Sequence, residues 1–167
     1  YACFTTEYSV CSNKMTVIKS SIERELNIYL KDKLSTCIDL NKVRDSGFNV
    51  QAGELKVDVS IGDYSTNINV NYPITISKGD TILKQDKFTK NFDVPLGRLI
   101  KVAQDIVNLA ISSPQGFVDN NAYAFAQNGE IQLERQTQGD TDIYITNARN
   151  NPYKFQFAIQ NYVVSFP

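Results

Sequence analysis

The sequence predicts an α+β fold, an antiparallel sheet with two amphipathic helices packed on one face. Apolar and polar residues alternate on both sides of a short loop at 62–65, which predicts a β-hairpin over 54–76. The stretches 17–38 and 95–112 instead repeat apolar residues every three or four positions, as amphipathic helices do. Extended segments follow each helix. The order helix, strands, helix, strands is typical of an α+β domain.

The first helix is expected to begin at Ser20, because Ser20 and Glu23 have the spacing of a capping box. Its apolar stripe would face the sheet, and its charged residues would face water. The stripe consists of Ile18, Ile22, Leu26, Tyr29, Leu30, Leu34 and Ile38. Such a helix could also bind a partner, but packing on the sheet is the preferred interpretation.

Between the two helices the sequence predicts strands separated by turns. A turn at 45–47 and a short strand at 48–50 precede the central hairpin. Pro73 lies within the second strand of that hairpin, which predicts an edge position or a bulge. A turn at 77–80 leads to one more extended strand over 81–92.

Pro95 suits the start of the second helix, because its missing N–H would be unpaired there, and Pro114 would follow the end of that helix. From 115 to 129 the sequence is rich in Gln, Asn, Gly and Ala, which predicts a mobile or variable loop that Tyr123 and Phe125 could anchor. Strands are predicted at 130–135, 142–146 and 154–159. The apolar tail at 162–166 is expected to form a further strand or an adhesive end.

Composition excludes several classes of protein. The 167 residues fit one core, and we expect an irregular arm over 1–15 and a single α+β domain over 16–167. The formal net charge is −1 and no basic stripe is present, so nucleic acid is not an expected partner. The absence of histidine removes the usual general base and the commonest metal ligand. No apolar run could span a bilayer. The sequence starts at Tyr1 and not at a methionine, which suggests a processed product or a piece of a longer chain, so any signal peptide or membrane anchor would lie upstream.

Three cysteines, Cys3, Cys11 and Cys37, lie in the first quarter of the chain. They predict either a disulfide that ties the arm to the first helix or reduced thiols in a cytosolic protein. The disulfide is favoured because little apolar periodicity holds the arm, with Cys11–Cys37 as first choice and Cys3–Cys37 as second. The remaining cysteine would be free or paired between chains. Zinc is not expected, because the chain lacks histidine and a Cys-x-x-Cys pair.

No motif predicts an enzyme, a metal or a cofactor. Asp140 and Asp142 could offer oxygen ligands to calcium, but the downstream Gly and Glu of an EF-hand loop are missing, so a plain turn is expected. Gly79 and Gly97 are isolated glycines near charged residues, without the pattern of a phosphate-binding loop. Serines and lysines are numerous, but none stands in a specific nucleophile pattern.

Short segments spread over most of the chain carry a family resemblance: 37–39, 47–50 with the following Gly53 and Glu54, 72–80, 94–99, Ala103 with Ile106 and Val107, and 152–158. In these segments the chain resembles an uncharacterised family of secreted or membrane-anchored proteins from small-genome archaea of the DPANN type. Family members begin with a hydrophobic segment, missing here, and carry a cysteine ahead of the one matching Cys37. The resemblance implies an extracytoplasmic location and a disulfide at Cys37. It implies no enzymatic activity, because none is known for the family.

These observations predict a non-enzymatic extracellular or cell-surface structural protein, such as a subunit of a filament or surface layer. The arm and the C-terminal strand could each add to a neighbour's sheet edge, giving a homo-oligomer or polymer. The alternative is a monomeric, surface-anchored binding or adhesion module that recognises a partner through the 115–129 loop. A hydrolase of unrecognised type comes third. The residues expected at assembly or partner contacts are Tyr123, Phe125, Tyr162, Val163, Val164 and Phe166.

Overall fold

The computed structural model describes residues 17–112, 118–139 and 141–160. Its helices and antiparallel strands follow the predicted order and confirm the α+β class. The contacts divide the chain into two compact units, Lys19–Asp93 and a unit that holds the described residues from Val94 onward. The sequence predicted one sheet with both amphipathic helices on one face. The described strands instead pair in two sheets, one of four strands and one of three, and the two helices, over 18–37 and 96–112, fall in different units.

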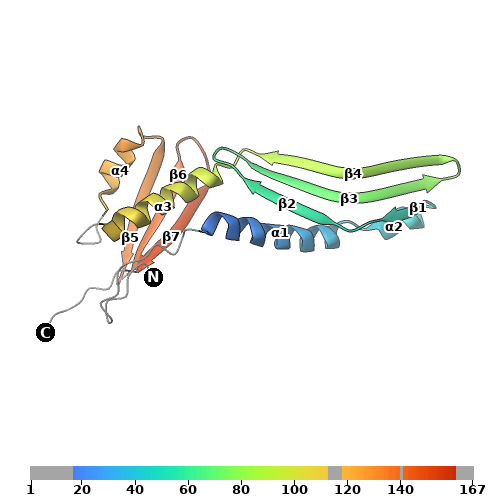
Figure 1. Cartoon of the computed structure of the whole chain (residues 1–167), viewed down its shortest axis with the longest axis horizontal. Helices are drawn as coiled ribbons and strands as arrows, with labels where there is room; N and C mark the ends of the chain where they lie inside the picture. The colour runs from blue at the N-terminus through green and yellow to red at the C-terminus, as the bar shows by residue number, and fades with distance from the viewer. Residues whose placement is uncertain (1–16, 113–117, 140, 161–167) are drawn as a thin grey trace. The chain divides into compact units, whose positions relative to one another are not determined.

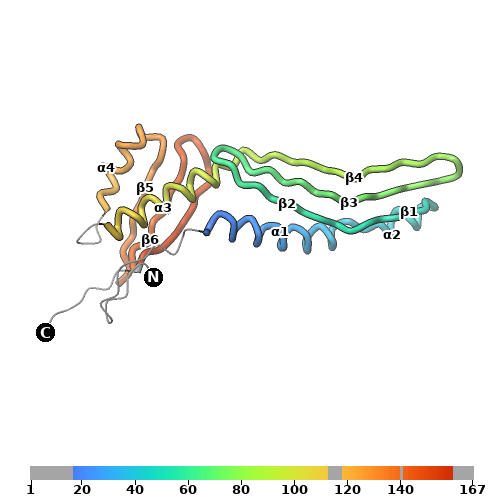
Figure 2. Tube along the Cα trace, in the orientation of Figure 1, coloured from blue at the N-terminus to red at the C-terminus, as the bar shows by residue number. Residues whose placement is uncertain are grey.

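The first unit is built around one long strand, β3, seen as part of the extended ribbon in Figures 1 and 2. The strands β1 and β2 pair with β3 one after the other along one side, and β4 pairs with it along the other side, all antiparallel. The elements are α1 (Ile18–Cys37), α2 (Leu40–Asp45), β1 (Asn49–Ala52), β2 (Lys56–Ile61), β3 (Thr66–Lys78) and β4 (Thr81–Phe92). The predicted hairpin and the strand after it are therefore confirmed.

The loop between β2 and β3 depends on Gly62. The N–H of Gly62 donates to the carbonyl oxygen of Ser65 at 2.8 Å, which closes the loop. A Cβ added at Gly62 would lie 2.8 Å from that same oxygen, closer than real Cβ contacts come. Glycine is thus required by a close approach of two backbone segments.

A β-bulge interrupts the pairing of β3 with β4 at the predicted proline. The register shifts between Asn71 and Ile74, so Val70 lies opposite Phe88 before the shift and Ile76 lies opposite Leu83 after it. Directly opposite residues share a face, so the bulge changes which residues of β4 lie beside the even-numbered residues of β3. The bulge expected at Pro73 is confirmed. The alternative edge position is wrong, because β3 has neighbours on both sides.

The start of the first helix differs from its prediction. The helix α1 begins at Ile18, so Ser20 lies inside it and the expected capping box is wrong. Glu23 contacts the sheet instead, as described below. The short helix α2 was not predicted, although Asp39 caps it by accepting a hydrogen bond from the N–H of Asn41 at 3.0 Å.

The second unit packs helices against a three-stranded sheet with β6 in the middle. Its core joins the apolar stripe of α3, including Leu99 and Ile106, to one face of the sheet, where Ile131 and Tyr144 are buried. The elements are α3 (Leu96–Ser112), α4 (Asn120–Ala126), β5 (Ile131–Gln138), β6 (Thr141–Ala148) and β7 (Lys154–Gln160). The helix predicted over 95–112 and the three predicted strands are confirmed, with longer strands than expected.

The mobile loop predicted over 115–129 is wrong for its described residues, because they contain the helix α4. The carboxylate of Asp119 accepts hydrogen bonds from the N–H groups of Asn121 and Ala122, both at 3.0 Å, and so caps the helix. Tyr123 is buried in the core and holds the helix in place. The helix was not predicted because its segment is rich in Asn and Gln, a composition typical of loops.

Candidate functional site

The outer edge of β4 is the most exposed element of the sheet in the first unit. All twelve residues of β4 are exposed, and within the described chain its only strand neighbour is β3. Four of these residues are large and apolar, with exposed fractions between 42% and 63%. They are Ile82, Leu83, Phe88 and Phe92. A long open edge with exposed apolar side chains is suited to pairing with another strand.

On the opposite side of the sheet, which β1 and β2 form in succession, side chains of α1 cap the edge of β2. The Oδ1 atom of Asn27 accepts a hydrogen bond from the N–H of Val59 at 2.7 Å, and Oε1 of Glu23 accepts one from Ile61 at 2.8 Å. Glu23 and Asn27 are four residues apart on the helix, a rise of about 6 Å, and Val59 and Ile61 are two residues apart on the strand, a distance of about 6.6 Å. The spacing of the two acceptors therefore matches that of the two N–H groups. The helix therefore takes the place of a neighbouring strand at this edge.

These two bonds also fix the direction of the backbone groups of β4. The N–H of Val59 points toward α1, so its opposite residue on β3, Ile68, directs its own backbone groups toward β4. There Ile68 lies opposite Lys90. Because these directions alternate along a strand, Thr89 and Asn91 direct their N–H and C=O groups to the open edge.

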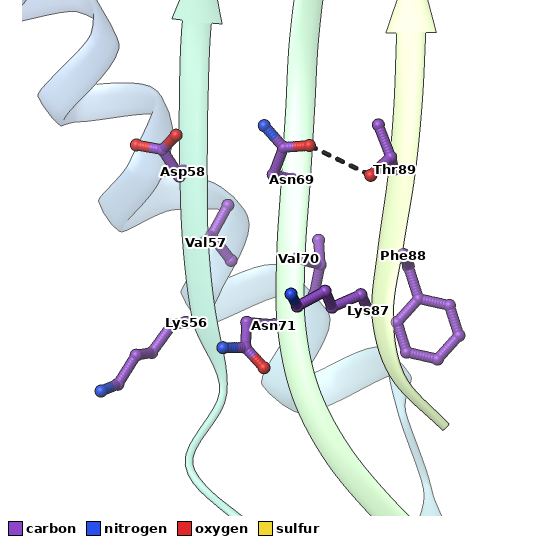
Figure 3. A pocket seen from close by; sticks show the side chains of 9 residues that line it. All are labelled: Lys56, Val57, Asp58, Asn69, Val70, Asn71, Lys87, Phe88 and Thr89. Carbon is purple, nitrogen blue, oxygen red and sulfur yellow. Dashed lines mark hydrogen bonds between the residues drawn. The ribbon is translucent and has the colours of Figure 1, made fainter. Parts of the chain in front are cut away.

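A shallow hollow of about 350 Å³ lies over the same three strands (Figure 3). It is lined by Lys56, Val57, Asp58, Asn69, Val70, Asn71, Lys87, Phe88 and Thr89. The hydroxyl of Thr89 donates to Oδ1 of Asn69 at 3.0 Å, and the ammonium of Lys56 lies 3.5 Å from the carboxylate of Glu54. The lining offers hydrogen-bonding groups and scattered charge. It holds no paired carboxylates and no base beside a nucleophile.

A buried polar cluster lies in the second unit. Asp142 is 7% exposed; its Oδ1 accepts a hydrogen bond from the Thr137 hydroxyl at 2.6 Å and lies 3.6 Å from Nε of Arg135. Burial raises the pKa of the neighbouring Tyr144, as does the negative charge of Asp142, while Arg135 acts in the opposite direction. The arginine neutralises the carboxylate, so this cluster is suited to a structural role.

The calcium site considered at Asp140 and Asp142 has no support in the geometry of Asp142, whose oxygen already contacts Arg135 and Thr137. Asp140 lies outside the described residues. Among the residues that the structure describes, no group of three or more acidic, cysteine or histidine side chains could hold a metal ion.

The predicted partner residues do not form one patch. Tyr123 is buried, and its hydroxyl donates to Oδ2 of Asp105 at 3.3 Å; burial and, secondly, this carboxylate raise its pKa. Phe125 on the same helix is 87% exposed, so it does not anchor the segment. Tyr162, Val163, Val164 and Phe166 lie outside the described residues. Of the two predicted partner residues that the structure describes, Tyr123 is therefore buried and Phe125 is exposed.

Cys37 is the last residue of α1, its side chain is exposed, and it forms no disulfide with another described residue. Its expected partners, Cys3 and Cys11, lie outside the described residues, so the disulfide stays a prediction.

The open edge of β4 was not among the predicted contacts, although the sequence contains a signal for it. Ile82 and Leu83 are adjacent, so they point to opposite faces of a strand. Three lysines, Lys84, Lys87 and Lys90, follow at intervals of three. Lysine is typical of edge strands, so this pattern could have identified β4 as an edge.

Within the described residues, the fold and this edge define an α+β protein whose larger sheet is capped by α1 along β2 and has no further strand beside β4. No family model, curated protein or solved structure matches the chain. None of the described helices combines the length and the apolar character needed to cross a membrane.

Proposed function

We propose that this chain is a non-enzymatic structural protein of the cell surface or extracellular space, and that its copies associate by strand pairing at sheet edges. The open edge of β4 is the observation that carries the proposal, since all twelve of its residues are exposed. The external location comes from the family resemblance. A filament or surface layer is the assembly that fits both arguments.

Strand pairing is favoured over side-chain docking by the contrast between the two edges. The edge of β2 is occupied by Asn27 and Glu23, whereas β4 offers backbone groups over roughly 40 Å, at about 3.3 Å per residue. An added strand would gain main-chain hydrogen bonds along this length without needing a specific motif. The lining of the hollow beside it supplies no chemistry that favours catalysis.

A proline at Thr89 tests this proposal directly. The backbone N–H of Thr89 points to the open edge, so Thr89→Pro removes an outward donor and leaves the hydrogen bonds between β3 and β4 in place. Light scattering and negative-stain imaging should show weaker assembly, while circular dichroism stays unchanged. Thr89→Ala is the matched control, because it loses the same hydroxyl but keeps the N–H. Equal assembly of both variants and wild type would argue against the β4 edge.

The arm and the tail remain the proposed donors of further strands, as the sequence predicts. Deleting 1–12 or 162–167 should then prevent polymer formation and leave the two units folded. Light scattering with and without reductant also tests whether Cys3 or Cys11 lies at a contact. Unchanged polymers in both deletions would exclude these donors.

The second candidate function is a monomeric binding module that acts through the 115–129 segment. Phe125, which is 87% exposed on α4, favours it. Such a module would stay monomeric at high concentration. A Phe125→Ser variant would then lose binding to cell-surface preparations without any change in mass.

A further inference from the structure

We propose that the open edge of β4 pairs with β4 of a second copy, antiparallel and two-fold symmetric, with Phe88 on the symmetry axis. This inference rests on the proposed function, because it names the occupant of the edge on which that function depends. The occupant is identified from the sequence of β4 itself, which is self-complementary about Phe88.

The charges around Phe88 match when the strand is placed against its own copy. In an antiparallel pair centred on Phe88, Asp86 lies opposite Lys90 of the second copy, and symmetry forms this pair twice. Lys84 lies opposite Phe92, an arrangement that allows a cation–π contact. Phe88 lies opposite its own copy, so both partly exposed phenylalanines gain a partner.

The backbone directions agree with this register. The odd-numbered residues of β4 are those whose backbone N–H and C=O groups point to the open edge. In the register centred on Phe88, the odd-numbered Lys87 of one copy lies opposite the odd-numbered Thr89 of the other. Odd residues can therefore exchange hydrogen bonds between the two copies, and a second strand would share or displace the Nε2 of Gln85, which donates to the carbonyl oxygen of Lys87 at 2.7 Å. Even residues, including Asp86, Phe88 and Lys90, form the closer pairs without backbone hydrogen bonds, where side-chain contacts are strongest.

The same charges reject the registers centred on the two preceding residues, Lys87 and Asp86. With Lys87 on the axis, Lys87 meets itself and Lys84 meets Lys90. With Asp86 on the axis, the two carboxylates meet. Like charges directly opposite each other are destabilising, so lysines that would discourage promiscuous pairing of this edge permit the register at Phe88.

One other register, centred on Gln85, also places Lys84 opposite Asp86. It sets Leu83 against Lys87 and moves Phe92 beyond the paired strand, opposite Lys78. The register at Phe88 is preferred because it gives both phenylalanines an aromatic or cationic partner.

A two-fold contact of this kind closes on itself and yields a dimer. A polymer would need a second contact, which the arm or the tail could provide. The dimer and the polymer can therefore be separated by experiment.

Charge reversal in the full-length protein tests the register. Lys90→Asp should weaken dimerisation about tenfold, because two opposite-charge pairs become like-charge pairs. Asp86→Lys should do the same, and the double variant should restore the wild-type dissociation constant measured by sedimentation equilibrium. Lys87→Asp is the matched control, because it makes the same change of charge at a position that lies opposite the uncharged Thr89. It should leave the dissociation constant within about threefold of the wild-type value.

Cysteine cross-linking fixes the register independently of charge. Paired Cα atoms about 4.5 Å apart are within disulfide range, so Phe88→Cys should form a peptide cross-linked through position 88, identified by mass spectrometry. A cross-link in Gln85→Cys and none in Phe88→Cys would overturn the register. If dimers or polymers form with the same dissociation constant in wild type and in every charge-reversal variant, this inference is wrong and the proposed function is unaffected. A protein that stays monomeric at every concentration would overturn both.

Discussion

Asn27 on α1 accepts a hydrogen bond from the backbone N–H of Val59 on β2 through Oδ1, at 2.7 Å. Four residues earlier on the helix, Glu23 does the same for Ile61 at 2.8 Å. A helix thus satisfies a strand edge that would otherwise be open to another strand. Because β2 is capped in this way, the strand pairing proposed for the first unit would use the edge of β4.

Removing the amide of Asn27 should weaken this capped edge. In Asn27→Ala the N–H of Val59, a residue only 4% exposed, loses its acceptor. We expect a loss of about 1–2 kcal/mol in the free energy of unfolding in urea. Hydrogen exchange should also speed up at the Val59 amide. Glu25→Ala is the control, since Glu25 is exposed on the same helix, and it should change stability by less than about 0.5 kcal/mol. Unchanged exchange at Val59 in Asn27→Ala would contradict the cap.

The buried carboxylate of Asp142 should contribute to the stability of the second unit. In Asp142→Ala the guanidinium of Arg135 loses the carboxylate beside it, and the Thr137 hydroxyl loses its acceptor. The side chain of Arg135 is 27% exposed and can be partly hydrated, so we expect a loss of about 2 kcal/mol, less than for a fully buried pair. Urea unfolding measures it. Gln136→Ala, on the exposed face of β5, should be nearly neutral, and an equal effect of both variants would exclude a specific role for the cluster.

The hairpin of β2 and β3 should depend on Gly62 for steric reasons. Gly62→Ala would place a Cβ 2.8 Å from the carbonyl oxygen of Ser65, so the loop must open, and we expect a loss of about 1–3 kcal/mol in thermal or urea unfolding. Gly79 provides the contrast. Its φ is +56° and a Cβ there would meet nothing within 4 Å, so Gly79→Asn should cost much less, because asparagine tolerates this conformation. A Gly62→Ala variant as stable as Gly79→Asn would contradict the close approach.

Local patterns predicted the elements well because each depends on a short stretch of chain. The alternation of apolar and polar residues predicted the strands β2 and β3, and Pro95 predicted the start of α3, which begins at the next residue. The bulge at Pro73 was one of two predicted alternatives, because sheets accommodate proline mainly at an edge or at a bulge.

Non-local features were not predictable in the same way. The spacing of Ser20 and Glu23 fits a capping box, but Glu23 bonds to Ile61, thirty-eight residues away in sequence. The division into two sheets depends on which strands pair with each other. The hydrophobic pattern of a strand predicts its buried face but not the strand with which it pairs. The lysines of β4 are typical of an edge strand, but they do not show which strand lies beside it.

High pH should destabilise the second unit through Tyr123. Burial and the nearby carboxylate of Asp105 raise the pKa of Tyr123 above its ordinary value of 10.0. The unfolded chain therefore releases this proton first as pH rises, so the stabilisation is complete below pH 10 and declines above it, by up to about 1.4 kcal/mol per pH unit. Urea unfolding at pH 9 to 11, a range of about two units around that value, would measure the decline.

Two variants separate Tyr123 from other groups that titrate at high pH. Tyr123→Phe cannot ionise, so its unfolding free energy should fall less steeply above pH 10 than that of wild type. Asp105→Asn removes the negative charge and keeps the tyrosine buried, so the decline due to Tyr123 should shrink without disappearing, since burial is the larger cause. Identical slopes in wild type and Tyr123→Phe would mean that the buried tyrosine does not control alkaline stability, and that the contact between α3 and α4 tolerates its ionisation.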